Sequence, residues 1–172
     1  MLNISVNTNA RNSTSPYEQI DALQDAVRER LAARYDLAVV LTPIFEPKNR
    51  EDAEKLLGNF LNRLNKCLFG NAAYRHGKHI DVFATIEGLS GNKRVHFNCT
   101  FALPANRKLE MLKLKIELCW RAVNSERDTK ISMQEIYDAD TWTRYTMKEL
   151  RANYTDCISE HTTWKIITRT NC

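Results

Sequence analysis

The sequence lacks several patterns that would point to other classes of protein. Its five cysteines form no C-x-x-C pair and are odd in number, which argues against a disulfide framework or a zinc ribbon. No stretch approaches the roughly 18 apolar residues of a transmembrane helix, and the first twenty residues contain no apolar signal core. We therefore expect an intracellular protein with no membrane partner, cytoplasmic in a bacterium or phage and nuclear in a eukaryote or eukaryotic virus.

Motifs for nucleotide hydrolysis are missing as well. The spacing from Gly70 to Gly77-Lys78 is too long for a phosphate-binding loop, and His79 stands where that loop needs Ser or Thr. Any unwinding of a duplex would therefore fall to a separate or host helicase. The net charge of +4 is compatible with a polyanionic partner but is too small to argue for one by itself.

The composition is that of an ordinary globular domain. The 172 residues are 43% hydrophobic and 27% charged, which is enough to build one core. Residues 1–15 are polar and without periodicity, so we expect a flexible N-terminal arm followed by a single domain over 16–172.

Hydrophobic periodicity predicts an α+β fold. Setting aside the first helix, the elements follow the order βαββαβ and then a helix, which is the ferredoxin-like (RRM-like) plan. We expect an antiparallel sheet of about five strands with helices packed mainly on one face, and the other face open. The predicted helices are 17–34, 50–69, 106–123 and 141–153, and the predicted strands are 36–45, 80–87, 94–103, 129–137 and 162–168.

Three polar residues share the predicted open face of two adjacent strands. His96 and Asn98 lie two apart on one strand, and Glu87 lies on the preceding strand across a short turn. A carboxylate, an imidazole and an amide oxygen can converge there on one ion, and such donors suit Mg²⁺ or Mn²⁺. The alternative is an ordinary polar sheet face in contact with water.

A second pair of residues could act on a phosphate bound near that ion. Tyr145 and Lys148 lie three apart on a predicted helix and so share one side of it. A tyrosine can attack a phosphate as a nucleophile, and an adjacent ammonium can stabilise the charge that develops. The alternative is a half-buried tyrosine beside a solvated lysine.

The order of these pieces resembles the HUH endonuclease superfamily, which includes rolling-circle replication initiators, relaxases and Y1 transposases. The chain has a VVLTP strand at 39–43, then His96-Phe97-Asn98 where the family has His-hydrophobe-His, then a Y-x-x-K motif at 145–148. The resemblance spans about residues 36–153, and residues 63–88 also look like phage-type initiators. It implies nicking and religation of single-stranded or hairpin DNA through a 5′-phosphotyrosine on Tyr145, with Lys148 assisting, in the replication or transposition of a mobile element.

This chain departs from the family at one metal ligand. Asn98 stands where the second His is usual, which is similar to viral initiators that carry Gln there and a Glu on the neighbouring strand. Two other hypotheses stay open: a non-catalytic single-stranded DNA or RNA binder on the same fold, and a decayed initiator that retains only DNA binding. An RNA-binding sheet would need exposed aromatic residues, and this face is predicted to have none.

Six residues are candidates for contact with DNA. Flexible cations near the strand ends can grip phosphates, although solvated loop charges are an equal alternative. Trp142, one turn before Tyr145, can stack on a base or fill the core. The six are Arg75, Lys78, Lys93, Arg94, Trp142 and Arg144.

Overall fold

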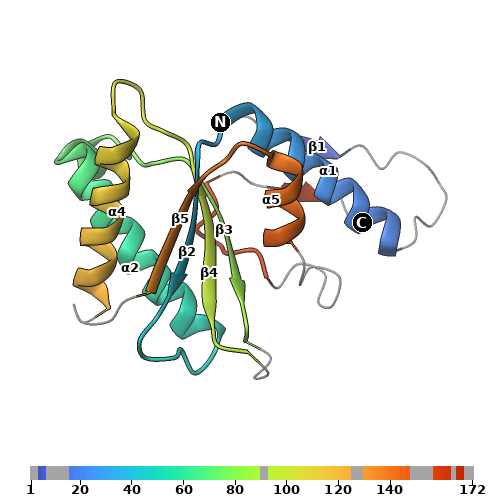
Figure 1. The fold of residues 1–172 in the computed structure, drawn as a ribbon, viewed down its shortest axis with the longest axis horizontal. Coiled ribbons are helices and arrows are strands. Elements are labelled where there is room, and N and C mark those ends of the chain that lie inside the picture. The colour runs from blue at the N-terminus through green and yellow to red at the C-terminus, as the bar shows by residue number, and fades with distance from the viewer. Residues whose placement is uncertain are drawn as a thin grey trace.

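The computed structural model describes residues 4–6, 16–89, 93–124, 130–147, 157–163 and 166–168. Over these residues the chain is α+β, with helices on both sides of one antiparallel sheet (Figure 1). The strands are β1 (Ile4–Val6), β2 (Leu37–Thr42), β3 (Val82–Glu87), β4 (His96–Phe101), β5 (Lys130–Glu135) and β6 (Ile166–Thr168). The helices are α1 (Pro16–Arg34), α2 (Arg50–Phe69), α3 (Ala72–Arg75), α4 (Leu109–Val123) and α5 (Ala139–Thr146).

The main sheet has four strands in the order β3-β4-β2-β5, and all three pairings are antiparallel. The prediction of about five strands is wrong for this sheet, because β6 pairs instead with β1 in a separate two-stranded sheet. That pairing takes residues 4–6 out of the N-terminal segment that we expected to be an arm; the rest of 1–15 lies outside the described residues. Among the described residues, no helix is both long and apolar enough to cross a membrane.

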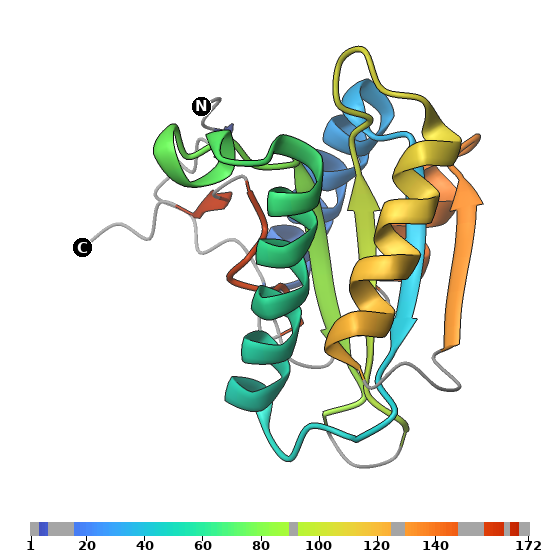
Figure 2. The same cartoon turned by 90° about the vertical axis from the view of Figure 1, so that its left-hand side faces the viewer.

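Helices α2 and α4 pack side by side on one face of the sheet (Figure 2). Alternation in β4 sends Phe97 and Phe101 to this side, where they meet Phe60 of α2 and Trp120 of α4 in edge-to-face contacts. Asn49 caps α2 by accepting a hydrogen bond from the Asp52 amide (2.8 Å). The apolar periodicity of the sequence therefore predicted this core correctly.

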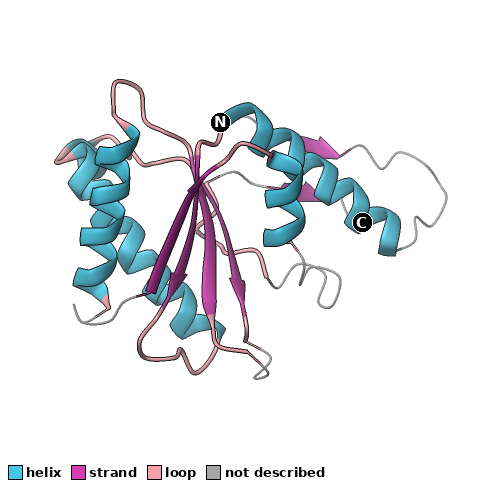
Figure 3. Cartoon of the chain, viewed as in Figure 1, coloured by secondary structure: helices cyan, strands magenta, loops and turns pink. Residues whose placement is uncertain are grey.

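Helices α1 and α5 pack on the opposite face (Figure 3). Leu23, Val27 and Leu31 of α1 form a second buried cluster with Phe83 of β3. The prediction that helices lie mainly on one face is therefore wrong, and so is the expectation that the polar face stays open. Its polar residues Thr85, Glu87, Asn98 and Thr100 are fully buried, whereas the β5 part of the same face remains exposed.

A C-terminal segment, residues 157–163, lies along the outer edge of β3. The amide of Ile86 donates to the carbonyl of Cys157 (2.7 Å), and the amide of Ser159 donates to the carbonyl of Ala84 (2.9 Å). The amide of Thr163 donates to the Val82 carbonyl (2.9 Å). The segment thus satisfies backbone groups that an uncovered edge strand would present to other chains.

Candidate functional site

The β3–β4 hairpin brings Glu87 and His96 together. They are direct cross-strand partners, and Nε2 of His96 lies 3.1 Å from Oε2 of Glu87. The carboxylate is fully buried, while the imidazole is 17% exposed. Gly88 makes the turn possible, because its φ is +87° and a Cβ there would lie 2.6 Å from the carbonyl oxygen of Arg94.

The hydrogen bond on the other side of the His96 ring fixes its tautomer. Nδ1 lies 3.0 Å from the Arg94 carbonyl oxygen, which can only accept, so Nδ1 carries a hydrogen. Nε2 then faces the Glu87 carboxylate across 3.1 Å. Two lone pairs repel at that distance, so the contact requires either a proton between the ring nitrogen and the carboxyl oxygen or a cation. A backbone carbonyl behind the ring is also the usual support of a metal-binding histidine.

Asn98 supplies a third donor on the same face. Its side chain is fully buried, and Nδ2 donates a long hydrogen bond of 3.4 Å to the hydroxyl of Thr85. Its Oδ1 is also buried and accepts no hydrogen bond from the described part of the chain. A buried acceptor without a donor costs about 1–3 kcal/mol, which a cation would offset. Two oxygens and one nitrogen of this kind are donors that suit a hard divalent ion, and the Glu87–His96 pair and Asn98 carry them on one face of the β3–β4 hairpin.

Helix α5 carries Tyr145 over this face of the sheet. Asp138 caps the helix by accepting hydrogen bonds from the amides of Asp140 and Thr141. At the other end, the carbonyl of Thr146 accepts a hydrogen bond from the hydroxyl of Thr85 (3.2 Å). Thr85 is the cross-strand partner of Asn98, so Thr146, the residue after Tyr145, lies over the strand face that carries the predicted ligands. Lys148, predicted to assist Tyr145, lies outside the described residues.

Tyr145 is 42% exposed and lies at the edge of a pocket of about 430 Å³. Its ring stacks on Trp142, with centroids 5.2 Å apart and planes 26° apart. Val40, which also lines the pocket, is the β2 partner of Asn98. Tyr145 and the three predicted ligands thus lie on the same side of the sheet, but the pocket is lined by Tyr145 and by none of the three ligands.

The predicted DNA-binding cations are divided between two ends of the sheet. Lys93 and Arg94 are exposed beside the Glu87–His96 pair, and the Arg94 guanidinium also holds the loop after β2 by donating to the carbonyls of Pro43 and Ile44. Arg144 is exposed on α5 and pairs with Asp140 (2.9 Å). The remaining two, Arg75 and Lys78, are exposed near the start of β3, at the far end from the site.

Lys130 is a residue that the sequence reasoning missed. Continuing the β2–β4 register by one residue places Thr42 opposite His96, and Thr42 pairs with Lys130 on β5. Adjacent strands lie about 4.8 Å apart, so the exposed Lys130 side chain can reach toward His96. The alternation in Lys130-Ile-Ser-Met-Gln-Glu135 could have revealed it, since Lys130 shares a face with Ser132 and Gln134.

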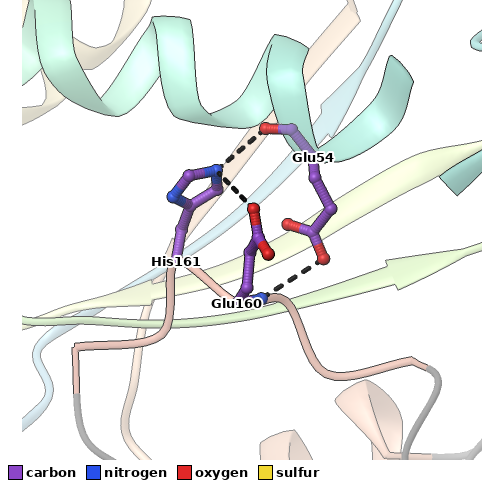
Figure 4. Close-up of side chains that lie close together, drawn as sticks. All are labelled: Glu54, Glu160 and His161. Atoms are coloured by element: carbon purple, nitrogen blue, oxygen red, sulfur yellow. Dashed lines mark hydrogen bonds and ion pairs between the residues drawn. The ribbon is translucent and has the colours of Figure 1, made fainter. Parts of the chain in front are cut away.

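A second group of potential ligands, Glu54, Glu160 and His161, is already occupied by contacts within the chain (Figure 4). The Glu54 carboxylate accepts hydrogen bonds from the Ser159 hydroxyl (2.6 Å), Arg50 (3.0 Å) and the Glu160 amide (3.2 Å). His161 Nε2 donates to the Glu54 carbonyl (2.9 Å), so it carries a hydrogen and cannot coordinate a metal in this arrangement. These hydrogen bonds, which we call the latch, hold residues 157–163 against α2.

No protein-family model, curated protein or solved structure matches this chain.

Proposed function

We propose that this chain is a metal-dependent endonuclease of the HUH type that nicks and rejoins single-stranded DNA through Tyr145. The fold supports the proposal. The strands of the βαββαβ unit, β2, β3, β4 and β5, form a fully antiparallel sheet with the first and third in the centre, in keeping with a ferredoxin-like plan. The role would be in rolling-circle replication or transposition of a mobile element inside a cell, with unwinding left to a separate helicase.

One observation carries the proposal. Glu87 and His96 meet at 3.1 Å, and Oδ1 of Asn98, which has no donor among the described residues, lies on the same face. The helix bearing Tyr145 ends on the neighbouring Thr85. A buried carboxylate and a buried amide oxygen without a donor among the described residues are each costly in ordinary packing, and here both lie on the sheet face that α5 covers.

Tyr145 would supply the nucleophile for the transfer. Its hydroxyl gives its proton to solvent, and its oxygen attacks the phosphorus, forming a new P–O bond to the tyrosine. The bond from phosphorus to the 3′ oxygen breaks, and that oxygen takes up a proton, leaving a free 3′-OH and a 5′-phosphotyrosine. One phosphodiester replaces another, so a 3′-OH can reverse the step and religate the strand.

Glu87, His96 and Asn98 would hold the ion, with His96 as the ligand that is partly exposed. Mg²⁺ or Mn²⁺ would supply Lewis-acid polarisation of the phosphoryl oxygens when bound. Lys130, across β2 from His96, and Lys93 and Arg94 in the hairpin would neutralise the DNA backbone on either side of the ion.

A non-catalytic single-stranded nucleic-acid binder is the second candidate, and two observations favour it. Glu87 and Asn98 are fully buried, which limits the approach of a phosphate to them. The Trp142–Tyr145 stack gives this face the aromatic surface that the strands themselves lack. On this hypothesis the chain binds DNA or RNA but forms no covalent product.

The two candidates differ in whether a covalent adduct forms. The protein is incubated with a pool of end-labelled single-stranded oligonucleotides and Mn²⁺, then separated on a denaturing gel. We expect a shifted, covalently labelled band from wild type, none from Tyr145→Phe, and an undiminished band from Tyr74→Phe, a matched control with an exposed tyrosine on α3. Binding without an adduct would favour the second candidate.

A further inference from the structure

The pocket beside Tyr145 has no role in the transfer step described above. It lies between β2, β5 and α5, with Val40 and Ser132 on the strands and Trp142 and Tyr145 on the helix. Its volume of about 430 Å³ falls in the lower part of the range typical of small-ligand sites, roughly 300–1,000 Å³. It can therefore hold one flat ring with its sugar rather than a folded peptide.

The charges that line the pocket disfavour a phosphate. Among the described residues, the charged ones that line it are Glu135 and Asp138, both carboxylates. Hydrogen bonds from Thr141 lower the pKa of Asp138, and Lys113 lowers that of Glu135. The Glu135 carboxylate pairs with Lys113 (2.9 Å) and the Asp138 carboxylate caps α5, so the described lining offers no cation to a phosphate and suits an uncharged ring.

The helix side of the pocket is aromatic. Trp142 and Tyr145 form a nearly parallel stack, and both rings line the space. The indole N–H of Trp142 is buried and finds no acceptor within the described ranges, which is uncommon for a partly buried tryptophan. Stacking on an aromatic side chain is the main way in which proteins hold bases of single strands, at about 1–3 kcal/mol per base.

The strand side of the pocket offers hydrogen-bonding groups that the fold does not use. Ser132 and Gln134 are exposed on β5, and neither side chain bonds to another described residue. The amide of Gln134 presents a donor and an acceptor side by side. That pair complements the adjacent amino group and ring nitrogen of adenine, which Gln recognises through two hydrogen bonds.

We propose that this pocket holds one base of the single strand next to the phosphate at Tyr145, and that Gln134 selects adenine there. The proposal deepens the proposed function and takes its strand and phosphate from it. Base recognition itself does not require cleavage, so the two can be tested apart.

The test measures binding in the Tyr145→Phe background, where no adduct forms. Short homopolymers of deoxyadenosine, deoxycytidine, deoxyguanosine and thymidine are titrated and followed by fluorescence anisotropy. We expect the adenine strand to bind at least about fivefold more tightly than the others, since one bidentate contact discriminates by about that factor or more. Gln134→Ala should abolish the preference, and Gln134→Glu should shift it toward cytosine, whose amino group donates to a carboxylate.

Gln134 is exposed, so these variants should fold, and Asn62→Ala on the opposite side of the sheet serves as an exposed-amide control that keeps the preference. Equal binding of all four strands, or an adenine preference that survives Gln134→Ala, would overturn the proposal. An adenine preference that depends on Gln134, in a wild type that forms no adduct, would support the pocket and refute the nicking activity. A covalent adduct with no base preference would support the nicking activity and refute the base pocket.

Discussion

Replacing Asn98 by leucine tests the metal site without any DNA. The side chain is fully buried, its Nδ2 makes only a long hydrogen bond of 3.4 Å, and its Oδ1 has no donor among the described residues. An unsatisfied buried acceptor costs about 1–3 kcal/mol, whereas so long a hydrogen bond contributes well under the usual 0.5–1.5 kcal/mol. Leucine has a similar volume and no polar atoms. In the presence of chelator we therefore expect Asn98→Leu to be more stable than wild type by about 1 kcal/mol.

Addition of Mn²⁺ should make wild type more stable than Asn98→Leu. An ion present at a hundredfold over its Kd stabilises the folded protein by about 2.7 kcal/mol. For a chain of 172 residues this is a rise in Tm of about 5–10 °C. Loss of one ligand should weaken Mn²⁺ binding on the order of tenfold, which removes about 1.4 kcal/mol of that stabilisation. The Tm of Asn98→Leu should therefore rise by about 3–5 °C less than the Tm of wild type.

Calorimetry of chelator-treated protein over a series of Mn²⁺ concentrations provides the measurement. Thr100→Val is the matched control, because Thr100 is equally buried two residues further along the same strand face and should leave the Mn²⁺ shift unchanged. If wild type shows no shift with Mn²⁺, or Asn98→Leu shifts as much as wild type, Asn98 is not a ligand and the reasoning is refuted.

Three further changes test the supports of the site. Gly88→Ala should destabilise the fold by more than about 1 kcal/mol and weaken Mn²⁺ binding, because its Cβ would meet the Arg94 carbonyl that orients the His96 imidazole. The control is Gly70→Ala, which has open space at φ +58° and should lower the melting temperature without changing Mn²⁺ binding. Glu54→Gln should loosen the latch on residues 157–163, seen as faster hydrogen exchange at the Ile86 amide; unchanged exchange would argue against the latch. Lys130→Ala should lower the cleavage rate, and it should reduce the slope of log binding constant against log salt concentration by about one phosphate contact. An unaltered slope would exclude Lys130 from contact with the DNA.

The shared face of the three predicted ligands could be predicted from the sequence because strand alternation is a local property. A period of two in 80–87 and 94–103 is enough to place Glu87, His96 and Asn98 on one face, and β3 and β4 have that register. The helix boundaries of α2 were predicted for the same reason, since an apolar stripe and a terminal Gly70 lie within the segment itself.

Burial of that face could not be predicted from the same pattern. Polar residues such as Thr85 and Asn98 normally indicate contact with water, but here Thr85 is buried because its hydroxyl bonds to the end of α5. The spacing of Leu23, Val27 and Leu31 predicts that α1 packs against another element, without showing which face of the sheet it covers. The pairing of β6 with β1 likewise depends on a contact between the two ends of the chain.

The most direct test of the central claim is to locate the covalent bond to DNA. Wild-type protein is incubated with cleavable single-stranded DNA and Mn²⁺, digested with nuclease and trypsin, and analysed by mass spectrometry. Cleavage after Arg144 and Lys148 releases a peptide with the sequence Tyr-Thr-Met-Lys, and we predict that this peptide carries a nucleotide through its tyrosine. A nucleotide found on any other residue, or no covalently linked peptide from DNA that the protein has cleaved, would contradict the account.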